Sequence, residues 1–244
     1  MNLDPNNLPR DMQTTRWSVI LLAGEEQGSD AEKALATLCE TYWFPLYAYI
    51  RRRGNSATEA QDLTQEFFAT LIDKKFVAAA DQERGRFRAF LLTACKHFLS
   101  KQRDKARAQK RGGGRKPLSL DLDLGESRYV AEPADTLTPE QLYDREWAVD
   151  LLKRVISRLE EEMVKSGKSD WFERIKVFIV AGHEDATYGE VAESLDTTEA
   201  AIKMAVHRMR KRYGKLLREE IAETLEHVAD VEDEIRALFA TFST

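Results

Sequence analysis

Residues 87–116 join an apolar helical stripe to a run of cations, and this pairing most constrains what the chain can form. At helical spacing the stripe contains Phe87, Phe90, Leu91, Ala94 and Phe98. Residues 84–116 include twelve Lys or Arg and one acid, in a chain whose formal net charge is −5. A cationic surface beside aromatic rings favours nucleic acid, and single strands in particular, because their bases stack on rings. Each ring taken alone is interpreted as part of the core.

A second basic segment lies near the end of the chain. Residues 198–218 contain seven Lys or Arg and one acid, so the remainder of the chain is strongly acidic. Two separate cationic segments on an acidic body predict two defined contacts with one long polyanion, rather than general binding to polyanions.

Apolar residues at helical spacing recur through most of the chain, with helices expected over 29–53, 139–163 and 171–180. Pro45 should kink or interrupt the first of these, since it lacks the amide hydrogen of a helix interior. We expect an all-α protein of two small helical domains joined by a flexible linker. The boundaries are a tail with a short helix (1–28), a first domain (29–111), the linker (112–138), a second domain (139–217) and a C-terminal helical extension (218–244).

Two helix starts carry clear local signals. Ser56 and Glu59 have the spacing of a capping box, and Thr138 precedes a proline at the first helical position. In the helix after Ser56, the expected buried stripe is Leu63, Phe67 and Leu71, broadened by Phe68 and Ile72. Another face carries Glu59, Asp62 and Glu66. Spacing alone leaves two interpretations open, a solvated surface or a docking face for a basic partner helix.

Residues 188–195 and 198–217 predict two helices joined by a tight turn, the second helix basic, which is a helix-turn-helix candidate. Thr198 should cap the second helix and offer its hydroxyl to a DNA phosphate. The expected inward side chains are Ile202, Ala205, Val206 and Met209. The side chains expected to face DNA are Lys203, His207, Arg208, Arg210, Lys211 and Arg212. The extension that follows should fold back on the second domain or shield a basic surface.

Several function classes lack support in the sequence. Cys39 and Cys95 have no metal or redox spacing, and buried reduced thiols would fit a cytoplasmic protein. No apolar run is long enough to span a membrane, and the N-terminus lacks a signal-peptide core. The four histidines form no metal motif. We therefore expect no enzyme activity, no cofactor, no metal and no membrane association.

Residues 59–68 read EAQDLTQEFF, which resembles the D-A-E-D-L-x-Q-E-x-F motif of extracytoplasmic-function bacterial RNA polymerase sigma factors, a branch of the sigma-70 family. The resemblance covers about residues 31–111 and 142–217. It implies that core RNA polymerase binds Glu59, Asp62, Gln65 and Glu66. This favours the docking interpretation of the acidic face.

The segment FRAFL at 87–91, with the basic run behind it, resembles the family segment that melts the promoter −10 element and holds the non-template strand. The implied −10 contacts are Arg88, Lys96, His97, Phe98, Ser100, Lys101, Arg103 and Arg107. The C-terminal helix pair resembles the family's reader of the −35 element. The implied −35 contacts are Thr198, Glu199, Lys203, His207, Arg208, Lys211 and Arg212.

The chain departs from the family pattern at Gln61, where an acid is usual. Thr58 and Thr64 flank that face, and we hypothesise that a phosphate on either would restore negative charge. A Ser/Thr kinase or an anti-sigma factor is therefore a candidate partner beside polymerase and promoter DNA. Asp196 stands where a turn glycine is usual, and Asp tolerates left-handed geometry.

These observations predict a non-enzymatic transcription initiation factor. The alternative is a dimeric helix-turn-helix repressor, with residues 1–110 as an effector or dimer domain. A repressor has no need of the acidic 59–66 face and would not bind polymerase. A hydrolase or metalloenzyme is disfavoured because no ligand or nucleophile motif is present.

Overall fold

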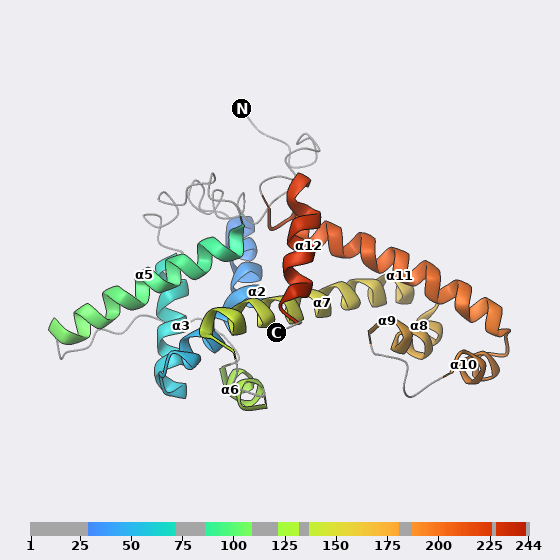
Figure 1. Ribbon diagram of the computed structural model, residues 1–244, viewed down its shortest axis with the longest axis horizontal. Coiled ribbons are helices and arrows are strands. Elements are labelled where there is room, and N and C mark those ends of the chain that lie inside the picture. Colours follow the sequence, from blue (N-terminus) through green and yellow to red (C-terminus); the bar gives the residue numbers. More distant parts are fainter. Residues whose placement is uncertain are drawn as a thin grey trace. The chain divides into compact units, whose positions relative to one another are not determined.

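The computed structural model describes residues 29–71, 86–108, 122–131, 137–180, 187–225 and 228–242 (Figure 1). Within these ranges all regular structure is helical, which confirms the predicted all-α class. Contacts divide the chain into two compact units, one of residues 1–148 with 221–244 and the other of residues 149–220.

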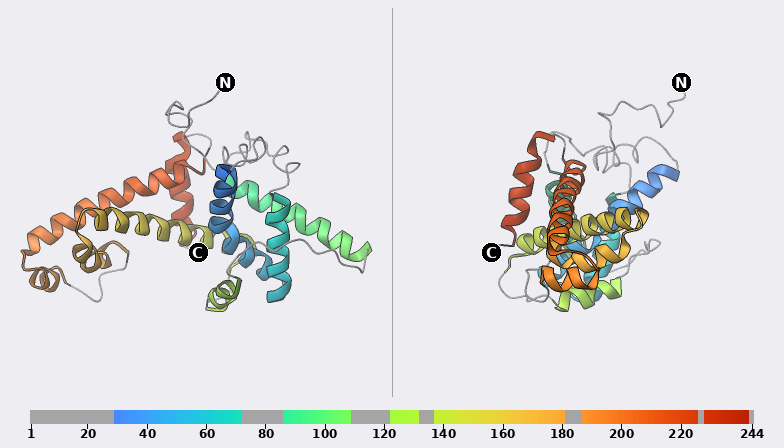
Figure 2. Two further views of the ribbon diagram at one scale, coloured as in Figure 1. Left: turned by 180° about the vertical axis from the view of Figure 1, so that it is seen from behind. Right: turned by 90° about the vertical axis from the view of Figure 1, so that its right-hand side faces the viewer.

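The first unit contains α2 (Ser29–Arg52), α3 (Ala57–Leu71), α5 (Phe87–Ala108) and α6 (Leu122–Ala131). It also holds the start of α7 (Pro139–Lys165), the end of α11 (Glu199–Ala222), the short 3-10 helix η3 (Val228–Asp230) and α12 (Val231–Ala240). Helix α5 crosses α3 (Figures 1 and 2). Fully buried rings fill the core of the first unit: Tyr42, Phe44, Tyr47, Tyr49, Phe67, Phe68, Phe87, Tyr143 and Trp147.

Helix boundaries follow the local signals. Ser56 and Glu59 form the expected capping box, since the Ser56 amide donates to Glu59 Oε2 (2.9 Å) and the Glu59 amide to Ser56 Oγ (3.3 Å). Thr138 Oγ1 accepts from the Gln141 amide at 3.2 Å. Helix α2 changes direction along its length in Figure 1 but is not interrupted at Pro45. Of the two expected effects of Pro45, a kink or an interruption, the interruption does not occur.

Part of the predicted flexible linker is a packed helix. Helix α6 lies against α2, where Glu126 accepts two hydrogen bonds from Arg51, from Nε at 3.0 Å and Nη2 at 2.8 Å, and one from the Tyr47 hydroxyl. The Arg128 guanidinium lies 3.7 Å from the centroid of the Phe44 ring. The linker prediction is thus wrong for residues 122–131, because these long-range contacts leave no periodic signal in a ten-residue helix.

The second unit contains the rest of α7 and α11 together with α8 (Ser169–Ile175), α9 (Val177–Val180) and α10 (Tyr188–Ser194). The single helix predicted over 171–180 is two short helices divided at Lys176. Gly167, with φ of +69°, follows the end of α7 and lies between the helices predicted over 139–163 and 171–180. The rings of Phe178 and Tyr188 stack with centroids 4.4 Å apart.

The C-terminal extension does not fold back on the second domain, which was one of its two expected arrangements. Residues 221–244 group with the first unit and not with the second. The backbone at the start of α5 contacts the backbone that follows α11, because the Phe87 amide donates to the Thr224 carbonyl at 3.2 Å. The alternative expectation, that the extension shields basic side chains, agrees with the contacts of α12 described below.

Candidate functional site

One face of α3 is acidic and exposed. Glu59, Asp62 and Glu66 are exposed and Gln65 is half-buried, whereas Phe67 and Phe68 are buried. The Glu59 carboxylate is engaged by Ser56, whose backbone amide and hydroxyl lower the pKa of Glu59. The carboxylates of Asp62 and Glu66 make no hydrogen bond or ion pair with another described residue, so their charge is directed to solvent.

A pocket of about 310 Å³ lies between this face of α3 and the helix α5. Its lining residues are Asn55, Glu59, Asp62, Leu63, Leu99, Gln102 and Arg103. Leu63 is half-buried on the pocket wall, so its prediction as core is corrected. Asp62 and Arg103, which the sequence placed in two separate sites, therefore share one pocket.

Thr64 cannot carry the phosphate that was hypothesised in this fold. Its side chain is 0% exposed, and its hydroxyl donates to the Ala60 carbonyl at 2.6 Å. Thr64 lies four positions after buried Ala60 and four positions before buried Phe68, so helical spacing alone could have revealed that Thr64 is buried. Thr58 is exposed, and the hypothesis stands for that residue alone.

The far part of α5, from Lys96 to the end of the helix, presents a polar, mostly cationic surface. His97, Ser100, Lys101 and Arg103 are exposed. Lys96 is half-buried and pairs with Glu140 across 2.8 Å. The side chain of Arg107 lies outside the described residues. The exposed members therefore form one accessible surface along the helix.

Phe98 is part of the core instead of this surface. It is 7% exposed, and its ring packs edge-on against Phe67 with centroids 5.6 Å apart. The interpretation of each ring as core is confirmed here, and the −10 assignment of Phe98 is corrected. A base cannot stack on a ring whose faces are covered by its own domain.

Arg88 is likewise a structural residue. It is 8% exposed, and its Nε donates to Glu234 Oε1 at 2.6 Å, with Asp144 paired to another nitrogen. Its guanidinium lies 4.8 Å from the centroid of the Trp147 ring. Arg86 Nε contacts the other Glu234 oxygen at 2.7 Å. The −10 assignment of Arg88 is therefore corrected, because acids of α7 and α12 already occupy its donors.

In the second unit, α10 and α11 are joined by a short turn. Asp196 has φ of +48°, and Thr198 Oγ1 caps α11 by accepting from the Ala201 amide at 3.2 Å. All four residues predicted to pack inward are buried: Ile202, Ala205, Val206 and Met209. The predicted turn residue and cap are thus where the sequence placed them.

The outward side of α11 is cationic. Lys203, His207, Arg208 and Lys211 are exposed, as are Thr198 and Glu199. Lys203 pairs with Glu199 across 2.6 Å, which raises the pKa of Lys203. The helix therefore offers several cations to a ligand on one exposed surface.

Two cations predicted to face DNA make contacts within the unit. Arg212 donates to both carboxylate oxygens of Glu162 on α7, at 2.8 and 2.5 Å. Arg210 donates to the Phe178 carbonyl at 3.2 and 2.7 Å. Arg210 is nevertheless exposed, so its expected DNA contact stays a prediction, whereas that of half-buried Arg212 is corrected. The cause is helical spacing, since Arg212 follows buried Met209 by three positions.

Groups associated with metal or redox chemistry are not gathered in the described part of the chain. There, no three His, Cys, Asp or Glu side chains are placed to hold a metal ion. Cys39 and Cys95 are buried, and burial raises the pKa of each thiol to about 12. No helix among the described residues has the length and apolar character needed to cross a membrane.

Comparison with protein families gives one match, to sigma-70 region 2, over residues 39–109. This stretch covers most of α2, all of α3 and α5, and less than a third of the chain. Neither the curated proteins nor the solved structures give a match. The first unit therefore contains a stretch that matches sigma-70 region 2.

Proposed function

We propose that the chain is a sigma factor of the extracytoplasmic-function type, which binds core RNA polymerase and directs it to promoters. The observation that carries this proposal is the sigma-70 region 2 match over α2, α3 and α5. Those helices carry both the exposed acidic face and the exposed cationic surface described above. A domain with both surfaces is suited to hold a basic polymerase element and a DNA strand at once.

Core polymerase would dock on Asp62, Gln65 and Glu66, with Glu59 fixing the start of α3. Asp62 and Glu66 lie one helical turn apart and are both exposed, so a basic partner helix can contact them together. Exposed charges at the rim of an interface contribute mainly to the orientation of the two partners and to their rate of association.

The opened −10 strand would run along the far part of α5. The contacts supported by exposure are His97, Ser100, Lys101 and Arg103, with half-buried Lys96 beside them. Strand separation needs no catalytic group, because binding of the unpaired strand offsets the lost base stacking.

The second unit would read the −35 element with α11. A basic helix preceded by a tight turn can enter the major groove while its cap contacts a phosphate. The residues supported by exposure are Thr198, Glu199, Lys203, His207, Arg208 and Lys211. We include Thr58 as a site at which a Ser/Thr kinase would add charge beside the docking face.

The test is co-elution of the full chain with bacterial core RNA polymerase on a sizing column. We expect an Asp62→Arg/Glu66→Arg variant to lose co-elution. A matched control is Asp170→Arg/Glu173→Arg, which makes the same charge change at two exposed positions of α8. The proposal fails if the wild-type chain does not bind core or if both variants behave alike, and a DNA-binding dimer without polymerase binding would favour the repressor alternative.

A further inference from the structure

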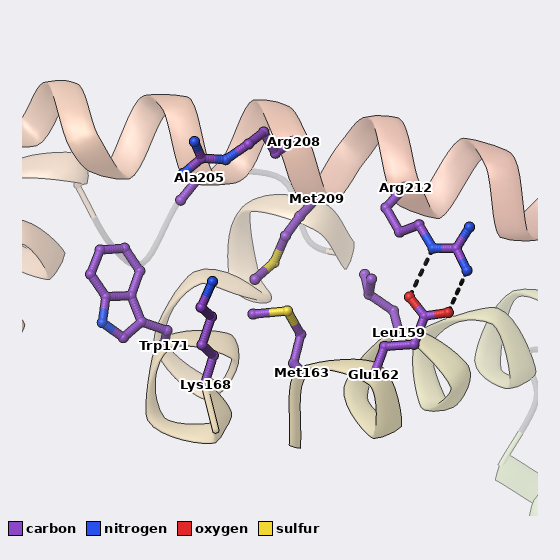
Figure 3. Close-up of a pocket in the computed structure, with 9 residues that line it drawn as sticks. All are labelled: Leu159, Glu162, Met163, Lys168, Trp171, Ala205, Arg208, Met209 and Arg212. Atoms are coloured by element: carbon purple, nitrogen blue, oxygen red, sulfur yellow. Dashed lines mark hydrogen bonds and ion pairs between the residues drawn. The ribbon is translucent and has the colours of Figure 1, made fainter. Parts of the chain in front are cut away.

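A pocket of about 370 Å³ opens within the second unit between α7, α8 and α11 (Figure 3). Its volume falls in the range typical of small-molecule sites. Its lining residues are Leu159, Glu162, Met163, Lys168, Trp171, Ala205, Arg208, Met209 and Arg212. Figure 3 shows Met163 and Met209 meeting from opposite sides, with Trp171 at one end.

The walls are apolar and adaptable. Met163 and Trp171 are half-buried, while Ala205 and Met209 belong to the packed stripe of α11. Methionine is flexible and polarisable, and it adjusts to ligands of different shapes. Such walls favour a flat or extended apolar body.

The polar groups leave an excess of positive charge. Glu162 is occupied by Arg212, whose hydrogen bonds lower the pKa of Glu162. Lys168 and Arg208 are exposed, and neither side chain makes an ion pair or hydrogen bond with a described residue. In Figure 3 the Lys168 side chain extends toward α11, which carries Arg208. Two cations at an apolar pocket are complementary to one anion on an apolar body.

We propose that this pocket binds a small amphiphilic anion, with its carboxylate on Lys168 and Arg208 and its apolar part between Met163, Met209 and Trp171. The pocket suits a free small molecule because an alkyl or aromatic body would contact these three side chains while the charged end stays at the open side of the pocket. This binding requires no DNA and does not depend on the function proposed above.

A consequence follows for DNA, and this consequence rests on the proposed function. Arg208 is also among the exposed cations of α11 proposed to contact the −35 element. A bound carboxylate and a DNA phosphate would compete for the same guanidinium, so each ligand would weaken the binding of the other by the same factor. The pocket would then couple an apolar acid to promoter binding.

The binding test uses octanoate and the full chain, measured by isothermal titration calorimetry. Octanol lacks the charge and acetate lacks the apolar body, so we expect octanol to bind at least about tenfold more weakly and acetate not measurably. Absence of octanoate binding, or equal binding of octanol, would overturn the proposal. A result in which only an acidic peptide with an apolar side chain binds would also overturn it.

Variants locate the site. Lys168→Gln/Arg208→Gln should lower the affinity for octanoate by about tenfold or more, since both charge-assisted contacts are lost. Lys153→Gln/Lys215→Gln removes the same charge from exposed residues outside the pocket and should leave binding unchanged. Met163→Gln keeps both cations and should also weaken octanoate binding. Equal affinity in all variants would place the ligand elsewhere and reject the assignment.

A final measurement separates the two proposals. Binding of a mixed-sequence DNA duplex to wild type is measured with and without octanoate, at fixed salt. We expect octanoate to weaken wild-type binding and to affect Met163→Gln less. Octanoate binding without an effect on DNA would reject the competition, whereas a chain that binds octanoate but no DNA would leave the pocket assignment standing and leave the proposed function to the test of polymerase binding.

Discussion

At the scale of single residues, Glu234 connects α12 to the start of α5. It is 0% exposed, and its two carboxylate oxygens contact Arg86 and Arg88. We expect Glu234→Gln to lower the free energy of unfolding by about 3 kcal/mol, because Arg88 would keep a buried charge with one acid fewer. Urea unfolding measures this change. Asp233→Asn on the same helix turn is the control, since its exposed pair with Arg236 contributes less than about 1 kcal/mol. Equal losses in the two variants would contradict the prediction.

Glu126 predicts a dependence of stability on pH. The hydrogen bonds from Arg51, together with that from Tyr47, hold the pKa of Glu126 below its ordinary value. A depressed acid pKa stabilises the fold above the ordinary glutamate value of about 4.3, and this stabilisation is lost as pH falls through the lower folded pKa. Glu126→Gln should therefore cost about 1 kcal/mol at neutral pH and progressively less below pH of about 4. Unfolding curves in urea at several pH values test this, and a constant difference across the range would be inconsistent with it.

Helical spacing identified some residues of the site and missed others for a local reason. The inward set of α11 and the exposed acids of α3 were predicted correctly because each follows from position on one helix. The family resemblance assigns Arg212 and Phe98 to DNA, but each lies three or four positions from a buried residue of its own helix, Met209 and Ala94 respectively. Arg88 differs, since Glu234 lies 146 residues away and no spacing reveals that pair.

At the scale of helices, the packing of α6 on α2 depends on a missing side chain at Gly125. A Cβ atom built there would lie 2.7 Å from Cζ3 of Trp43. We expect Gly125→Val to overpack this contact by about 1 to 3 kcal/mol and to release α6. Hydrogen exchange should then lose protection over residues 122–131. Ser127→Val is the control, because it adds the same branched side chain at an exposed position. Retained protection in Gly125→Val would show that Trp43 moves aside without cost.

Helix starts were predictable where a few neighbouring residues suffice to form them. The caps at Ser56, Thr138 and Thr198 each need only a hydroxyl and an amide three residues on. Helix α6 has no such signal, and its docking depends on Arg51, Tyr47 and Glu146 from distant parts of the sequence. The break at Lys176 was also missed, since the apolar pattern continues through both short helices.

At the scale of the whole molecule, chain order does not coincide with the compact units. The sequence predicted that the extension would fold back on the second domain or shield a basic surface, and residues 221–244 group with the first unit. Val231 and Leu238 are buried there with Glu234. The C-terminal residues therefore help to form the unit that carries the region 2 match.

Removal of residues 228–244 tests this arrangement. We expect hydrogen-exchange protection to fall in α2, α3 and α5, because the truncated chain loses two buried apolar side chains and the carboxylate that pairs with Arg88. Protection of residues 188–216 should change little, since they belong to the other unit. A chain lacking only residues 243–244 is the control and should match the full chain. Loss of protection in 188–216 with none in α5 would instead mean that the extension stabilises the second unit. With the expected result, defects of the truncated chain in polymerase binding would come from the unit that carries Asp62 and Glu66, even though the deleted residues lie more than 150 positions away along the sequence.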